Sequence, residues 1–242
     1  MNHDIAYDRC KAFIDCHLKE SGQAIRLGAK FGERPFVTIS GQAGAGGLVL
    51  ASRLVNHLQQ RLPGPSSPWT FFEKNLVQKV LEEHHLPKNL ARFMPENRVS
   101  AIADMMESLF GIHPPDWSLV HHTAETILHL AELGYVILVD RAANIITDRF
   151  PAGVHVRVVG SREIRVHRIM EYLKLDPKAA QRFVDQTDRG RRRYVKDHFE
   201  QDIEDPLLYH VMVNTDFVPL DEATRLVGDL VVEKRARMEK AP

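Results

Sequence analysis

The pattern of apolar and polar positions predicts strands that alternate with helices. The run Phe36–Ser40 is apolar and β-branched, and Tyr135–Asp140 is the clearest buried parallel strand of the chain. Helical periodicity follows the first of these strands, over 48–62. Strands alternating with helices favour a three-layer α/β domain with a mainly parallel sheet. Further strands are expected at 69–72, 154–159 and 208–215, and further helices at 7–30, 74–84, 96–111, 117–133, 161–174, 177–198 and 220–236.

A glycine-rich turn joins the first strand to its helix. It consists of Gly41, Gln42, Ala43, Gly44, Ala45, Gly46 and Gly47. Backbone N–H groups of such a turn and of the helix start can surround a phosphate. In the pattern GxxxxGK[ST], the glycine positions are filled, but Gly47 stands at the lysine position and Leu48 at the hydroxyl position. The turn therefore predicts a backbone phosphate site without the lysine charge or the side-chain magnesium ligand. The alternative is a tight turn without a ligand.

A basic segment lies in the long helix expected at 177–198. Residues 187–196 carry five basic side chains and one acidic one, and residues 197–205 carry five acidic side chains and no Lys or Arg. Arg189 and Arg193 are spaced i and i+4, so both can point from one helix face. Arginine suits the charge that phosphoryl transfer spreads over oxygens. One alternative is a solvated face paired with the following acids. Another is an RNA-binding patch, although no aromatic platform accompanies the segment.

Composition excludes several classes of protein. The 242 residues include 32 basic and 32 acidic side chains, and zero net charge argues against a nucleic-acid-binding or membrane-surface protein. No apolar run is long enough to span a membrane, and the polar start does not resemble a signal peptide. Only two cysteines occur, which argues against a disulfide framework. We therefore expect a cytoplasmic protein with neither membrane nor nucleic-acid partners. The sequence makes no prediction of the oligomeric state.

One histidine-rich helical face has metal-ligand spacing. His121, Glu125 and His129 are four residues apart, but no further ligand elsewhere in the chain accompanies them. A structural role on the helix is the simpler expectation.

Four segments together resemble the cytidylate kinase-like family, a branch of the phosphate-loop nucleoside monophosphate kinases. They are VTISGQAGAGGLVLASRL (37–54), GYVILVDRAANII (134–146), VHVRVVGSREIRVHRIME (154–171) and FVDQTDRGRRRYVKDHFEQDIEDPLLYHVMVNTD (183–216). The spacing of TDRxRxxY, DPLLY and NTD is their most specific part. The resemblance implies a five-stranded parallel core over 35–236, with a monophosphate-binding insert at about 69–133 and a helical lid at about 176–205. Residues 1–34 would form an N-terminal helical extension.

The resemblance also implies an activity and its residues. The ATP γ-phosphate would pass to CMP or a related acceptor with Mg²⁺, so nucleotides are the expected substrates. By this likeness, Arg141 would hold the acceptor phosphate, and Arg189 and Arg193 would close on the transferred group. Glu73 and Lys74, in FFEKNL (71–76), would lie at the acceptor site.

The chain departs from its relatives at the loop and after the strand at 135–140. Relatives carry lysine at position 47, or a family variant with Arg, Glu and a basic residue where this chain has Gly41, Gln42 and Leu48. Asp140 stands where relatives often have glycine, and it either binds magnesium or pairs with Arg141. Two functions stay open: a nucleoside monophosphate kinase, or a degenerate nucleotide-binding regulatory or interaction module without kinase activity.

Overall fold

The computed structural model describes residues 10, 12, 13, 32–64, 68–73, 96–110, 118–139 and 142–240. Most of the helix expected at 7–30, and all of the one expected at 74–84, lie outside the described residues. The same is true of three expected site residues, Lys74, Asp140 and Arg141.

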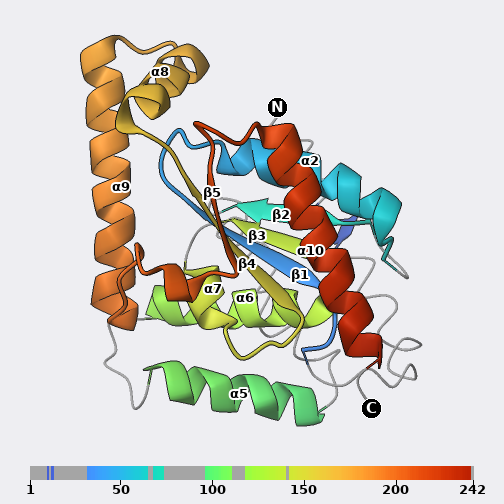
Figure 1. Ribbon diagram of the computed structural model, residues 1–242. Helices are drawn as coiled ribbons and strands as arrows, with labels where there is room; N and C mark the ends of the chain where they lie inside the picture. The colour runs from blue at the N-terminus through green and yellow to red at the C-terminus, as the bar shows by residue number, and fades with distance from the viewer. Residues whose placement is uncertain are drawn as a thin grey trace.

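A five-stranded sheet forms the centre of the molecule, with the strand order β2-β3-β1-β4-β5 (Figure 1). Every neighbouring pair is parallel, so the sheet is fully parallel where the sequence predicted a mainly parallel one. Because parallel strands end on the same edge, this order brings the ends of β1, β3 and β4 together around the glycine-rich turn. The strands are β1 (Phe36–Gly41), β2 (Thr70–Glu73), β3 (Val136–Val139), β4 (Gly153–Val159) and β5 (Val211–Asn214).

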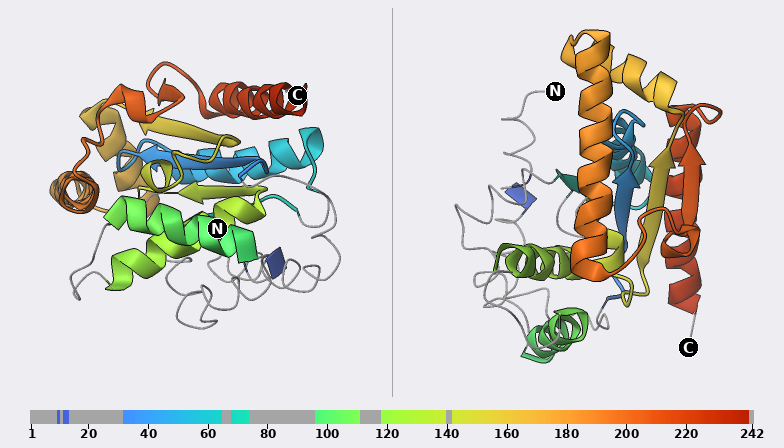
Figure 2. Two further views of the ribbon diagram at one scale, coloured as in Figure 1. Left: turned by 90° about the horizontal axis from the view of Figure 1, so that it is seen from below. Right: turned by 90° about the vertical axis from the view of Figure 1, so that its left-hand side faces the viewer.

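Helices cover both faces of the sheet, which confirms the predicted three-layer α/β fold (Figures 1 and 2). Helices α2 and α10 pack on one face, α6 and α7 on the other, and α5 packs outside α6. No described helix combines the length and apolarity that a membrane span requires. The helices are α2 (Gly47–Arg61), α5 (Glu96–Phe110), α6 (Ser118–Leu133), α7 (Ala143–Ile146), α8 (Arg162–Leu173), α9 (Pro177–Phe199) and α10 (Leu220–Lys240).

Alternation along the strands produces two apolar cores. In β1, Val37 and Ile39 are buried in the core with α2 and α10, whereas Phe36 is buried in the core with α6 and α7. Both cores are needed because a parallel sheet with helices on each face is buried on both sides.

The long helix α9 begins as the sequence predicted. Asp176 is its N-cap and accepts a hydrogen bond of 2.9 Å from the Ala179 N–H, and Pro177 is the first helical residue. The strand expected at 208–215 is shorter, since Pro206–Leu208 form a 3₁₀ turn and β5 begins only at Val211. Asp205 caps this turn by accepting from the Leu207 N–H, a local bond that overrides the apolar pattern. Helix α7, with four residues, is too short for periodicity to reveal.

A buried histidine lies on β4. The Nδ1 atom of His155 is 2.9 Å from Thr38 Oγ1, and its ring centroid is 4.9 Å from that of His210. The His210 Nε2 atom is in turn 3.0 Å from Lys234 Nζ. Burial, followed by the positive neighbours His210 and Lys234, lowers the pKa of His155 to about 3. This histidine is therefore neutral in the folded protein at neutral pH.

The low pKa of His155 predicts a loss of stability in mild acid. Below the unfolded pKa of about 6.5, the unfolded chain binds a proton that the folded chain excludes, so the free energy of unfolding falls by up to about 1.4 kcal/mol per pH unit. Denaturant unfolding from about pH 7 to about pH 5 should show a steeper loss for the native chain than for His155→Gln, which lacks the titrating group. Two curves that run parallel over this range would contradict the prediction.

Candidate functional site

The glycine-rich loop between β1 and α2 adopts a conformation that needs glycine at two positions. Gly44 has φ 79° and Gly46 has φ 93°, both in the left-handed region. A Cβ atom at Gly44 would lie 2.4 Å from the carbonyl oxygen of Arg165, and one at Gly46 would lie 3.1 Å from a methyl carbon of Leu220. These glycines let α8 and the start of α10 approach the loop closely.

Four carbonyl groups of the loop accept hydrogen bonds, three of them from side chains outside the loop. The first N–H groups of a helix have no acceptor within the helix, so the start of α2 offers hydrogen-bond donors. The neighbouring carbonyl groups of the loop are already bound. The loop therefore favours an anion at the start of α2. Gly41 O accepts from Arg191 Nη1 (2.7 Å), Gln42 O from the Ala45 N–H (3.0 Å) and Ala43 O from Arg165 Nη1 (2.9 Å), and Ala45 O lies 3.0 Å from Thr215 Oγ1.

Ala43 is the residue through which the α8–α9 hairpin docks on the loop. Its N–H donates to Asp188 Oδ1 on α9 over 2.7 Å, and Asp188 Oδ2 is 2.7 Å from Arg165 Nη1 on α8. Arg165 and Asp188 are both buried. The Ala43 methyl group packs with Val166 and Val184 in an apolar cluster inside the hairpin. The loop and the hairpin thus form one packed unit.

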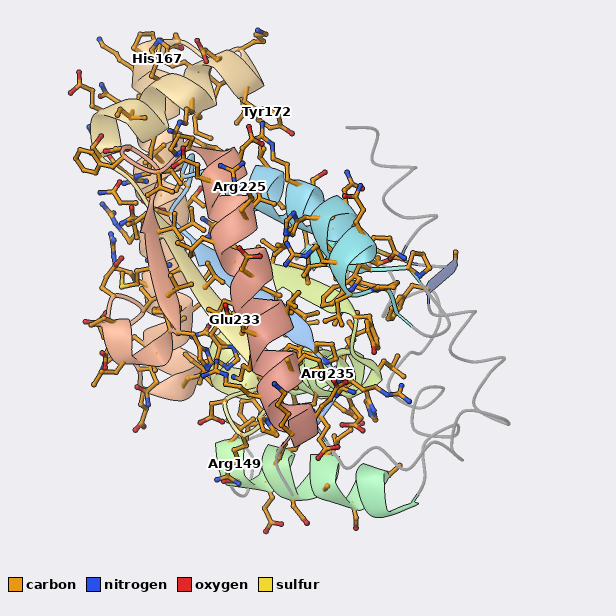
Figure 3. All side chains as sticks on the ribbon, turned by 45° about the vertical axis from the view of Figure 1, so that its right-hand side comes forward. Arg149, His167, Tyr172, Arg225, Glu233 and Arg235 are labelled. Carbon is orange, nitrogen blue, oxygen red and sulfur yellow. The ribbon has the colours of Figure 1, made fainter. Side chains whose placement is uncertain are left out.

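The hairpin projects beyond the sheet. In Figures 1 and 2, α9 runs along the side of the molecule where the strands end, and α8 lies at its outer end. Figure 3 shows His167 and Tyr172 on α8, beyond the start of α10. An exposed pair, Arg162 and Asp185, joins the two helices through contacts of 2.9 and 2.7 Å. The hydrogen bonds from Arg162 hold the pKa of Asp185 below its usual value.

The arginines of α9 point in different directions. Arg189 is exposed, and Arg193 is 81% exposed and pairs with Asp197 over 3.0 Å. Arg192 lies 3.9 Å from Glu204 in the following acidic segment. Arg191 instead contacts the loop at Gly41. For Arg193, the structure therefore shows the alternative of a solvated helix face paired with the following acidic residues. The lid role of Arg189 and Arg193 stays a prediction.

Sequence reasoning missed Arg191, although the pattern contains a signal for it. The inward side of α9 includes Ala180, Val184, Asp188, Arg191 and Val195, at spacings of four, four, three and four. This is the helical period, so Asp188 and Arg191 continue an apolar stripe. Arg189, one residue after Asp188, is rotated by about 100° from that stripe. The i and i+4 spacing of Arg189 and Arg193 identified a shared face, but not the inward one.

A second group that the sequence did not indicate lies at the end of β1. Arg157 on β4 is 2% exposed and donates to Ser40 Oγ and to Glu204 Oε1, each over 2.9 Å. The Tyr209 hydroxyl donates to the Ile203 carbonyl over 2.8 Å, and burial raises the pKa of this phenol. These contacts attach the acidic segment after α9 to the sheet directly beneath the loop.

Of the residues predicted to hold the acceptor nucleotide, the structure describes Glu73. Glu73 ends β2 and pairs in register with Val139, the last residue of β3. The sequence continues from Val139 directly to Asp140 and Arg141, so Glu73 lies at the sheet edge from which those two residues follow.

Within the described part of the chain, the histidine-rich face of α6 is not part of a metal site. Among the described residues, no group of three or more His, Cys, Asp or Glu side chains is arranged to hold a metal ion. His129 instead lies 3.9 Å from Glu125, and this neighbouring imidazole lowers the pKa of Glu125. Both residues line a cavity of about 360 Å³ between α5 and α6, with no lining residue from the loop or the α8–α9 hairpin.

A family comparison matches most of this fold. The model of the cytidylate kinase-like family matches residues 36–217, which include the loop, the hairpin and all five strands. The chain belongs to the cytidylate kinase-like family. Membership in this family identifies a nucleotide kinase-like protein and confirms the resemblance found in the sequence.

Two solved structures are similar to this chain at low sequence identity. An uncharacterized protein from Eubacterium ventriosum ATCC 27560 is 19% identical with a TM-score of 0.59, over 83% of this chain and 99% of that one. Shikimate kinase from Bacteroides thetaiotaomicron is 12% identical with a TM-score of 0.41, over 86% of this chain and 99% of that one. No curated protein matches the chain. The likeness to the first structure concerns the fold alone.

The Ala43 contact predicts that Asp188 stabilises this cytidylate kinase-like domain strongly. In Asp188→Asn, the amide oxygen can still accept from Ala43, but the buried Arg165 loses its counter-charge, which should cost about 3 kcal/mol or more in the free energy of unfolding. The measurement is denaturant unfolding at neutral pH. Asp185→Asn, at the exposed pair of the same hairpin, is the matched control and should have a much smaller effect. Equal losses in the two variants would contradict the assignment.

Proposed function

We propose that the protein transfers the γ-phosphoryl group of ATP to CMP or a related nucleoside monophosphate and releases ADP. The observation that carries the proposal is the loop between β1 and α2. The carbonyl groups of Gly41, Ala43 and Ala45 accept hydrogen bonds from protein donors, and the N–H groups at the start of α2 are the donors that a helix start offers to an anion. Phosphoryl transfer depends mainly on positioning and electrostatic stabilisation, and such a loop can provide both.

Backbone N–H groups would hold the triphosphate. Gly46, Gly47 and Leu48 supply the donors, because they form the entry to α2 and its first turn. Ala43 is not among them, since its N–H is bonded to Asp188. The position of the loop at the carboxyl end of β1 is the usual ligand site of an open parallel sheet.

Mg²⁺ fits the site as an ion that the nucleotide brings with it. Leu48 has no oxygen ligand, and Asp140 is the candidate carboxylate among the residues that follow β3. Mg²⁺ commonly keeps several waters and binds substrate phosphates with only one or two carboxylates. When bound, it would neutralise charge on the phosphate oxygens.

The acceptor would bind beside the loop. In this proposal, Glu73, Lys74 and Arg141 hold the acceptor nucleotide, with Arg141 on its phosphate. Arg189 and Arg193 lie on the outer side of α9, so they would reach the transferred group only through a movement of the hairpin. A cytoplasmic location belongs to the same proposal, because ATP and nucleoside monophosphates are available there.

One observation favours a second function, a nucleotide-binding regulatory or interaction module. Position 47 has no charge and position 48 has no hydroxyl group, so two side chains typical of phosphate-transferring loops are absent. Losing one preorganised electrostatic group commonly lowers a rate by about 10²–10³-fold. Binding could therefore persist where transfer does not.

Two measurements on the native chain test these functions. Isothermal titration with ATP and Mg²⁺ should show binding, and an ADP-release assay over a panel of nucleoside monophosphates should show turnover with CMP or a related acceptor. Binding without ADP release for any acceptor would contradict the kinase and favour the binding module. A chain that binds neither ATP nor GTP would contradict both.

A further inference from the structure

A lysine and a histidine meet at the edge of the sheet opposite the glycine-rich loop. The Nζ atom of Lys234 donates to the Gly153 carbonyl over 2.5 Å and lies 3.0 Å from Nε2 of His210. Gly153 begins β4 and pairs in register with the first residue of β1, whereas the loop lies at the other end of β1. Figure 3 labels Glu233 and Arg235, the sequence neighbours of Lys234, in the half of α10 away from the α8–α9 hairpin. The pair therefore lies outside the proposed nucleotide site.

A backbone hydrogen bond fixes the tautomer of His210. The His155 N–H donates to Nδ1 of His210 over 2.9 Å, so Nδ1 presents a lone pair and carries no proton. A neutral imidazole with an unprotonated Nδ1 carries its proton on Nε2. Burial lowers the pKa of His210, which keeps the ring neutral at neutral pH. The atom of His210 that faces Lys234 is therefore a hydrogen-bond donor.

A donor at Nε2 of His210 requires an acceptor at Lys234. An ammonium group has three N–H donors and no acceptor, whereas a neutral amine has one lone pair for the Nε2–H and keeps N–H donors for Gly153. Among the described residues, no carboxylate pairs with Lys234. Glu239, on the same helix, pairs with Arg235 over 2.9 Å. These contacts fit Lys234 as a neutral amine.

The charges around Lys234 favour the same state. Burial, followed by the positive charge of Arg237, lowers the pKa of Lys234. The titratable groups from the sheet are the two histidine rings, and on α2, which packs beside α10, Arg61 pairs with Asp229. In acid the amine binds a proton, and it is then one of the positive neighbours that lower the pKa of His155.

A neutral amine is the nucleophilic form of lysine. Lys234 is partly buried, so a small electrophile such as carbon dioxide suits it. The Nζ lone pair would form the N–C bond, one C=O electron pair would move onto oxygen, and one N–H proton would pass to water. The product is a carbamate, which is an anion. Its remaining N–H would keep the bond to Gly153, and its oxygen would accept from Nε2–H of His210 close to the charge of Arg237.

We propose that Lys234 is a modification site at which the amine held by His210 and Gly153 reacts reversibly with carbon dioxide to form a carbamate. The proposal goes beyond the proposed nucleotide function and does not depend on it, because the two sites lie at opposite edges of the sheet.

Carbon-13 NMR of the native chain in ¹³C-labelled bicarbonate, at mildly alkaline pH, tests this site because it observes a carbamate carbon directly. Lys234→Arg removes the amine but keeps a positive side chain. Lys240→Arg is the matched control, since it removes an exposed lysine near the end of the same helix. His210→Gln tests the histidine, because the glutamine oxygen can accept a hydrogen bond from an ammonium group. Thermal unfolding checks that each variant is folded.

We expect the native chain to show a carbamate signal that Lys234→Arg loses and Lys240→Arg retains. In His210→Gln the protonated lysine returns, and it has no lone pair for carbon dioxide. The signal of this variant should therefore fall by about tenfold or more.

The other outcomes contradict the proposal. A native chain without a carbamate signal, or a signal that Lys234→Arg retains, would show that Lys234 is not the site. Equal losses in Lys234→Arg and Lys240→Arg would show that the reaction does not select the amine beside His210. An unchanged signal in His210→Gln would show that His210 does not hold the amine in its neutral form.

Discussion

Arg165 and Asp188 form a buried ion pair that holds both backbone polar groups of Ala43, and the arrangement of the site depends on it. A buried pair loses the hydration of two charges, so it is stable only where further hydrogen bonds satisfy both partners. Here the loop backbone provides those bonds. The same contact sets the position of α8 and α9 over the loop and brings Arg191 to Gly41. The conformation of the loop, the docking of the hairpin and the charges near the loop therefore all depend on this ion pair.

The charged side chains are segregated along the sequence and also between the outer and inner sides of the fold. The chain has equal numbers of basic and acidic residues, and α9 with the segment after it contains a dense block of each sign. In the structure, Arg193 pairs with Asp197 on the outside, while Arg157 and Arg191 meet the end of β1 from two sides. A neutral total thus accompanies charges that are paired both on the outside of α9 and, between Arg157 and Glu204, at the end of β1.

The sequence was sufficient to predict the framework and part of the site. Local rules suffice for β1, for the glycine-rich turn and for the Asp176 cap of α9, because strand pattern, positive φ and capping depend on near neighbours. Arg157 and Arg191 were not predicted, since their roles depend on how β4 and α9 pack against residues more than a hundred positions away. The spacing rule applied to Arg189 and Arg193 identifies a helix face but not the direction in which that face points. The buried apolar stripe through Val184 and Val195 shows which face of α9 points inward.

Backbone N–H groups at the start of α2 are the donors on which the proposed phosphate site depends. Nitrogen-15 NMR of the labelled chain, titrated with a non-hydrolysable ATP analogue, observes these groups directly. The amide signals of Gly46, Gly47 and Leu48 should shift as the analogue binds, and that of Ala43 should shift least, because its N–H is bonded to Asp188. Saturation that moves other amides while those of Gly46, Gly47 and Leu48 stay in place would contradict a phosphate site at this loop.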